Sequence, residues 1–137
     1  MDDAFWTAGV RAAGACHFLT VALAAVTPIP ANWEDNLARL PEVHRRFAVA
    51  QNIFIGATML FAGGVSVLFA PQLVAGTVLA RVICAAIALW WAARLVVLPW
   101  LRVGPELRTP LLRTGFVLLH AQCAIFMVAY GWLALRG

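Results

Sequence analysis

Hydrophobic residues in this chain gather into four long runs, separated by shorter stretches that carry most of the charged residues. Each run contains roughly 20 mostly apolar residues, the length that a helix needs to cross a membrane. A proline stands at a boundary of each run, where it can end or begin a helix but cannot continue one. The pattern predicts four transmembrane helices, at about residues 7–27, 46–70, 77–98 and 111–135.

The connections between these runs suggest how the helices follow one another. The connection that begins at Pro71 is short, which predicts an antiparallel hairpin of the second and third spans. In the first loop, Asn32 and Asp35 have the spacing of a helix N-terminal cap. Trp33 and Leu37 then fall on one helix face, which predicts a short amphipathic helix lying in the membrane interface. Tryptophans at the span ends fit an aromatic belt, and these are Trp33, Trp100 and Trp132.

The composition agrees with residence in a membrane. Of the 137 residues, 64% are hydrophobic and 12% are charged, whereas a soluble domain averages about 45–50% apolar and about 25% charged residues. A chain of this length could not hide so much apolar surface from water. We therefore expect a single domain over residues 1–137, an all-α integral membrane protein folded as a four-transmembrane-helix antiparallel bundle.

Small residues on two of the spans favour close helix packing. The first span is rich in alanine and glycine, and one face of the second carries Asn52, Gly56, Met59, Gly63 and Ser66. These faces are typical of a compact bundle.

The basic residues are all arginines, ten in number, and the net charge is +4. They are dispersed between the apolar runs, which favours a membrane over a nucleic acid as the partner. Three arginines fall on the side of the two termini and seven on the side of the two long loops. By the positive-inside rule the long loops are cytoplasmic and both termini lie outside. The lysine-free, alanine-rich composition suggests a GC-rich bacterial genome, and hence a bacterial inner membrane.

Two histidines lie deep inside the predicted spans. His17 stands eleven residues before Pro28, and His120 stands ten residues after Pro110. At about 1.5 Å per residue both side chains fall about 15–16 Å from the same membrane surface, near the bilayer midplane. A bis-imidazole haem b site would require two histidines at matched depth.

The two histidines also suit roles that need no haem. With Cys123 and Met127, on the same side of the fourth span as His120, they form a donor set suited to a soft transition metal such as Cu(I). They could also serve a proton relay, or bind nothing and only satisfy hydrogen bonds inside the bundle.

Arg94 is the one charged residue deep inside a predicted span. Its long side chain could reach the cytoplasmic interface. Alternatively it could face inward and hold an acidic group: a haem propionate, a lipid phosphate or a carboxylate of a neighbouring subunit. No acidic residue lies within a span, which disfavours a proton-coupled transporter.

A basic rim borders the predicted cytoplasmic surface and could bind lipid headgroups. Its members, taken from both long loops, are His44, Arg45, Arg46, Arg108 and Arg113.

The chain has no phosphate-binding loop, no zinc-protease motif and no paired carboxylates, so we expect no enzyme. Three function classes remain. The first is a non-catalytic accessory subunit of a larger membrane complex, whose partners are the bilayer and other membrane subunits or further copies of the chain. The second is a haem b electron-transfer or haem-sensing protein. The third is a lipid- or small-ligand-binding protein.

Overall fold

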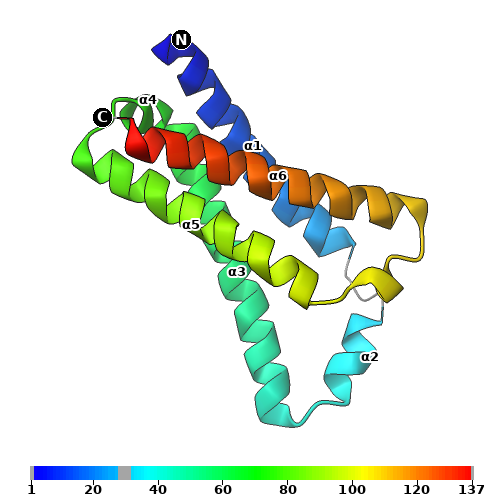
Figure 1. Ribbon diagram of the computed structural model, residues 1–137. Helices are drawn as coiled ribbons and strands as arrows, with labels where there is room; N and C mark the ends of the chain where they lie inside the picture. Colours follow the sequence, from blue (N-terminus) through cyan, green and yellow to red (C-terminus); the bar gives the residue numbers. More distant parts are fainter. Residues whose placement is uncertain (1, 28–31, 137) are drawn as a thin grey trace.

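The computed structural model describes residues 2–27 and 32–136, and the regular elements within these ranges are helices (Figure 1). Four of them are long and apolar enough to cross a membrane. This confirms the prediction of an all-helical chain with four candidate spans. The long helices are α1 (Asp3–Val26), α3 (Glu42–Leu68), α5 (Val78–Trp100) and α6 (Pro110–Leu135). The short ones are α2 (Trp33–Ala38), α4 (Ala70–Val74) and the 3-10 helix η1 (Gly104–Glu106).

The helix ends follow local chemistry that the apolar runs only outline. Thr77 and Thr109 each accept a backbone N–H bond with the side-chain oxygen, which begins α5 and α6. Pro110 is the first residue of α6, one residue before the predicted start, because a helix needs no N–H at that position. Pro99 does not end α5, which continues through Trp100. The predicted stop of the first span at Pro28 lies outside the described residues.

The long helices associate as two close pairs. α1 packs against α3, and α5 packs along α6, while α4 lies between α1 and α5. The predicted hairpin of the second and third spans is therefore wrong as a packed pair. The connection that begins near Pro71 forms the separate helix α4, which turns the chain so that α5 finds its main neighbour in α6.

The α1–α3 pair is close because glycines face each other where the helices cross. A Cβ placed on Gly14 would lie 2.8 Å from the Gly63 carbonyl oxygen and 2.7 Å from the Val67 side chain. A Cβ on Gly63 would lie 3.1 Å from the Gly14 carbonyl oxygen. Only the absence of side chains at both positions lets the two backbones approach this closely. The buried face of α1 is thus formed by Val10, Gly14 and His17.

The first half of α3 diverges from the other long helices (Figure 1). Its buried residues begin only at Met59, and none lies between Glu42 and Thr58. Of the predicted packing face of this helix, Met59, Gly63 and Ser66 are buried, but Asn52 is exposed. A compact antiparallel bundle of all four helices is therefore not confirmed.

The short helix α2 occurs where the sequence predicts one, but its start is built differently. The Asn32 side chain makes no capping bond to the backbone. It pairs instead with the side chain of Asn36, one turn later, at 3.1 Å. The predicted cap is wrong because the two amides satisfy each other. The placement of α2 in a membrane interface stays a prediction.

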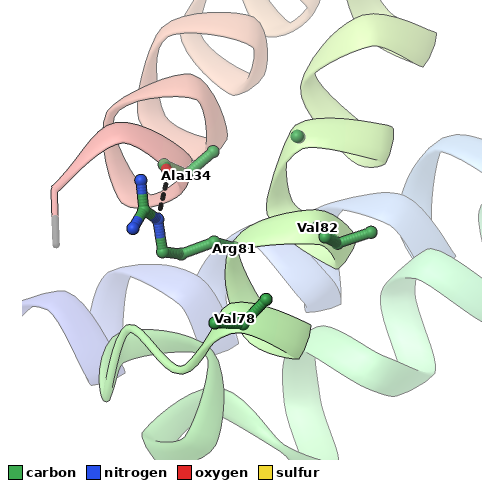
Figure 2. A pocket seen from close by; sticks show the side chains of 5 residues that line it. Val78, Arg81, Val82 and Ala134 are labelled. Atoms are coloured by element: carbon green, nitrogen blue, oxygen red, sulfur yellow. Dashed lines mark hydrogen bonds between the residues drawn. The ribbon is translucent and has the colours of Figure 1, made fainter.

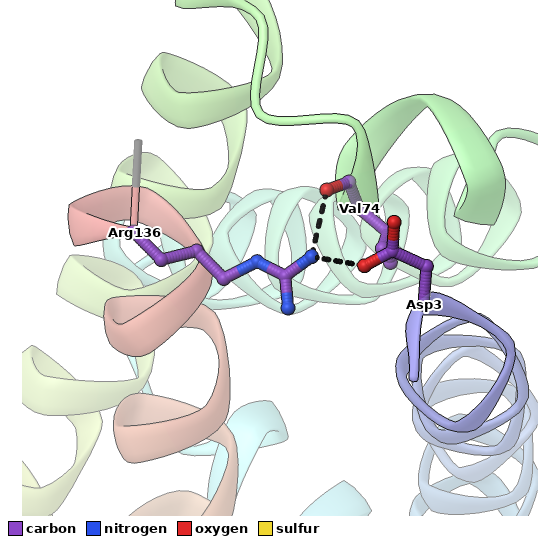
Figure 3. A network of polar contacts seen from close by, with 3 residues as sticks. All are labelled: Asp3, Val74 and Arg136. Carbon is purple, nitrogen blue, oxygen red and sulfur yellow. Dashed lines mark hydrogen bonds and ion pairs between the residues drawn. The ribbon is translucent and has the colours of Figure 1, made fainter. Parts of the chain in front are cut away.

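Two arginines join the elements near the chain ends. The Arg81 Nε of α5 donates to the Ala134 carbonyl oxygen in the last turn of α6, 2.8 Å away (Figure 2). The Arg136 Nη2 donates to Asp3 Oδ1 at 2.8 Å and to the Val74 carbonyl oxygen at 3.1 Å (Figure 3). Cations at these carbonyls complement the negative ends of α4 and α6.

Candidate functional site

The long helices meet at a buried polar junction around His17. This imidazole has no exposed surface, and its Nδ1 lies 2.7 Å from the Ala13 carbonyl oxygen in the preceding turn. Its Nε2 lies 3.1 Å from the indole nitrogen of Trp91 on α5. A carbonyl can only accept and an indole N–H can only donate, so Nδ1 carries the proton and Nε2 accepts. Both nitrogens of a neutral ring are thereby satisfied.

Aromatic rings enclose this imidazole. The Phe126 ring stacks on it with centroids 4.9 Å apart, and the Trp91 and Tyr130 rings meet it edge-on at 5.3 and 6.3 Å. Trp91 also meets Phe126 edge-on at 5.2 Å. These offset and edge-on arrangements are the ones that aromatic quadrupoles favour, so the side chain of His17 is held as part of the core.

The second contact of the junction joins α3 to α6. The Ser66 and Tyr130 hydroxyls lie 2.6 Å apart, and both side chains are fully buried or nearly so. Together the His17–Trp91 and Ser66–Tyr130 contacts link one helix pair to the other. Hydrogen bonds between side chains of different helices stabilise membrane proteins because few alternative partners exist in lipid.

His120 lies away from this junction. It is half-buried, its Nδ1 lies 2.8 Å from the Phe116 carbonyl oxygen, and its ring meets the Phe116 ring edge-on. Phe126, against which His17 stacks, is six residues or about 9 Å further along α6, and about 240° around the helix. The matched depth of the two histidines does not bring them together.

These residues do not fit a haem or a shared metal ion. A metal would need the Nε2 lone pair of His17, which already accepts the Trp91 N–H. Cys123 is fully buried, and Met127 packs against the core beside it. Within the described ranges no cluster of three or more histidine, cysteine or acidic side chains could hold a metal ion.

Arg94 on α5 and Gln122 on α6 carry further buried polar groups. The Thr20 hydroxyl of α1 lies 3.0 Å from Gln122 Oε1. Gln122 Nε2 and Arg94 Nε are buried and lack a hydrogen-bond partner among the residues that the structure describes. The guanidinium of Arg94 lies 5.6 Å from the centre of the Trp90 ring, within the range of a cation–π contact.

The predicted basic rim is split between two regions. The side chains on α3 are exposed, and Arg46 pairs with Glu42 one turn away. Arg113, on α6, donates from Nε to the Leu107 carbonyl oxygen at 3.0 Å. The start of α3 and the loop between α5 and α6 lie at different corners of the molecule (Figure 1). The structure thus does not gather His44, Arg45 and Arg46 with Arg108 and Arg113.

Sequence reasoning missed Trp91 as the partner of His17 and Ser66 as the partner of Tyr130. The signal for Trp91 is weak, because Trp90 beside it is equally aromatic and only helix rotation decides which indole faces inward. Ser66 is the only serine in the chain, and a lone hydroxyl in an apolar span has to find a partner. That reasoning could have identified it.

Comparison with known proteins adds no assignment. No known protein family, curated protein or solved structure shows significant similarity to this chain.

Proposed function

We propose that this chain is a non-catalytic subunit of a larger membrane complex, in which the first half of α3 docks against a transmembrane helix of another subunit. The observation that carries the proposal is the exposure of two carboxamides, Gln51 and Asn52, on the part of α3 that has no buried residue. They lie roughly 8–9 Å along the helix from Arg46. Polar groups inside a membrane are unfavourable in lipid and face other protein in most cases.

The surroundings of these amides suit a helix. Large apolar side chains flank them, among them Ile53 and Phe54, which is 72% exposed. Gly56 follows one turn later and has open space around its missing side chain. Asparagine and glutamine side chains form hydrogen bonds between transmembrane helices, and small residues let backbones approach. This face thus offers both kinds of contact.

Charge favours a different subunit over a second copy. In a symmetric dimer the same surface meets itself, which would bring His44, Arg45 and Arg46 of both copies together. Glu42 compensates only Arg46. A partner helix that ends in carboxylates would complement this cationic end, whereas a second copy would repel it.

The experiment is purification after mild detergent extraction, with a Gln51→Leu, Asn52→Leu double variant beside the native chain. We expect a partner at fixed stoichiometry with the native chain and its loss with the double variant. Thr114→Val, which removes an exposed polar group from α6, serves as the matched control and should retain the partner. A partner that the double variant retains would overturn the proposal. So would a native chain that purifies alone, or a self-cross-link through a cysteine placed at Asn52.

The proposed orientation puts both long loops in the cytoplasm of a bacterial inner membrane and both termini outside, with the four long helices crossing in alternating directions. It is supported by the unequal distribution of arginines between the two sides. A cysteine placed at Gly104, in η1, should react with a membrane-impermeant thiol reagent only after the membrane is opened. Labelling of this cysteine in intact cells would show that the protein has the opposite orientation.

The haem alternative receives no support from the geometry, because Trp91 occupies the nitrogen that a haem iron would need. Lipid binding is favoured by Arg94, whose buried Nε lacks a hydrogen-bond partner among the residues that the structure describes.

A further inference from the structure

The register of α5 against α6 places Arg94 next to Cys123 and Gln122. Trp91 contacts Phe126, with ring centroids 5.2 Å apart. The helices run in opposite directions, so one turn further along α5 is Arg94 and one turn back along α6 is Cys123. Gln122 is the neighbour of Cys123 in sequence and reaches toward Thr20 on α1.

Arg94 and Gln122 each carry a buried side-chain nitrogen whose hydrogen-bonding capacity is not used in the observed arrangement of the described residues. Arg94 Nε and Gln122 Nε2 are buried and unpaired among the described residues. The Thr20 hydroxyl has one proton, and the Cys16 carbonyl oxygen at 2.7 Å competes with Gln122 for it. If Cys16 takes that proton, the Gln122 amide turns its nitrogen to Thr20. The guanidinium keeps its full charge in either arrangement.

That charge has no counter-ion in the part of the chain that the structure describes. The six acidic residues of the sequence lie outside the predicted spans, and the described ion pairs involve only Arg46 and Arg136. Arg94 lies six residues, or about 9 Å, before the end of α5 at Trp100. A cation so placed is stable beside an anion or where it can reach the interface.

We propose that Arg94 binds the phosphate group of an anionic membrane phospholipid. A phosphate supplies acceptor oxygens for several guanidinium N–H groups at once. The depth of Arg94 lies within reach of a headgroup at the bilayer surface. Exposed apolar side chains of both helices, including Val97 and Leu118, offer a surface for the acyl chains.

The charge of the adjacent loop agrees with an anionic lipid. Arg102, Arg108 and Arg113 lie on the connection between α5 and α6 or at its edge, with Glu106 as the only acid between them. Basic regions between transmembrane helices bind anionic headgroups. This inference does not depend on the proposed subunit role, because it concerns a different face of the molecule.

The test measures the thermal midpoint of the intact chain in mixed micelles with phosphatidylglycerol or phosphatidylcholine. We expect phosphatidylglycerol to raise the native Tm by about 10 °C at a hundredfold excess over the dissociation constant. Arg94→Gln should lose this shift, and Arg45→Gln, which removes an exposed charge from the distant start of α3, should keep it. Gln122→Glu should also lose the shift, because its carboxylate would neutralise Arg94 from within.

Each other outcome overturns the proposal. An equal shift in all variants would show general attraction of lipid to the basic surface. A similar Arg94-dependent shift with inorganic phosphate alone would indicate a site for a free anion. A protein partner lost from the Arg94→Gln variant, without a lipid effect, would assign the counter-ion to a carboxylate of another subunit. If Arg94→Gln fails to fold, the Gln122→Glu variant tests the proposal instead. It keeps Arg94 in place, and glutamate has nearly the same size as glutamine.

Discussion

At the scale of single residues, the hydrogen bonds of His17 determine what this side chain can do. Depth along the spans predicted that His17 and His120 could share a ligand, since both fall near the same level. Depth follows from counting residues, but the direction of each ring depends on helix rotation, which the count does not contain. The observed partners, Ala13 and Trp91, occupy both nitrogens of His17.

Replacing Trp91 with phenylalanine should destabilise the fold by removing the N–H that His17 Nε2 accepts. A phenyl ring is also smaller than the indole, so the loss combines one unpaired buried nitrogen with a small cavity, about 2 kcal/mol in all. Unfolding by denaturant in a fixed detergent would measure the change. Trp90→Phe is the matched control and should be closer to neutral, because the Trp90 indole nitrogen has no hydrogen bond to a described residue. Equal losses in both variants would contradict the assigned role of Trp91.

A second expectation at this scale concerns haem. Because Trp91 occupies the His17 nitrogen, addition of haem to the purified protein should give no Soret band that depends on His17. Absorption spectra of the native chain and His17→Ala, recorded after removal of unbound haem, would check this. A band present in the native chain and absent from His17→Ala would show that the imidazole leaves Trp91 to ligate iron.

At the scale of helices, the glycines at the α1–α3 crossing set how closely the two elements approach. Gly14→Ala should push the helices apart, since the added Cβ would lie 2.8 Å from the Gly63 carbonyl oxygen. Overpacking of this kind costs about 1–3 kcal/mol. Gly9→Ala is the control on the same helix, where an added Cβ meets open space. That variant should be neutral or slightly stabilising, because alanine favours helix over glycine.

Unfolding free energies of the two variants, measured in the same detergent, would check the crossing. A similar stability for Gly14→Ala and the native chain would mean that the crossing is loose enough to accommodate a methyl group. Circular dichroism should show unchanged helix content in both variants, so that the difference reports packing alone.

The elements themselves could be predicted from the sequence much better than their partners. Runs of apolar residues located four long helices, because helix length in a membrane is set by the bilayer. Pairing was predicted wrongly for the second and third spans, since a short connection need not join neighbours when it forms a helix of its own, as α4 does. Gly14 of α1 is buried at the crossing with α3, whereas Gly9 of the same helix is exposed. Composition alone cannot distinguish these two glycines.

At the scale of the whole molecule, two helix pairs are held together by few polar contacts. The candidate site was only partly predictable from the sequence, because its contacts join residues on helices that are distant along the chain. Arg94 was recognised as exceptional because its charge is visible in the sequence, whereas the contacts of Ser66 and Tyr130 depend on the pairing of distant helices. The link between α3 and α6 rests on this hydroxyl pair, whose oxygens lie 2.6 Å apart.

A double-mutant cycle with Ser66→Ala and Tyr130→Phe should reveal this link. Each single change removes one of the two buried hydroxyls and leaves the other unpaired, whereas the double change removes both. We expect a coupling energy of about 0.6 kcal/mol, the average for interhelical hydrogen bonds in membranes, and no more than about 1.7 kcal/mol. The unfolding free energies of the native protein, the two single variants and the double variant together give the coupling energy. Strict additivity would mean that the two hydroxyls act independently and that other contacts join the helix pairs.

The chain ends provide a further connection across the molecule, and its contacts differ in strength. Asp3 is 78% exposed, so its ion pair with Arg136 should contribute little and weaken with salt. Arg136 is 24% exposed and also bonds the Val74 carbonyl oxygen at the end of α4. Its guanidinium further lies 5.7 Å from the centre of the Trp6 ring.

Arg136→Gln should therefore destabilise the protein more than Asp3→Asn, by about 1–2 kcal/mol against less than about 1 kcal/mol. The effect of Asp3→Asn should fade at 1 M salt, where charges are screened within about 3 Å. Most of the Arg136→Gln effect should persist, because the contacts with the carbonyl and the indole are short and shielded from solvent. Unfolding at low and high salt would measure both variants. Equal, salt-sensitive losses would mean that the ion pair alone holds the two ends of the chain together.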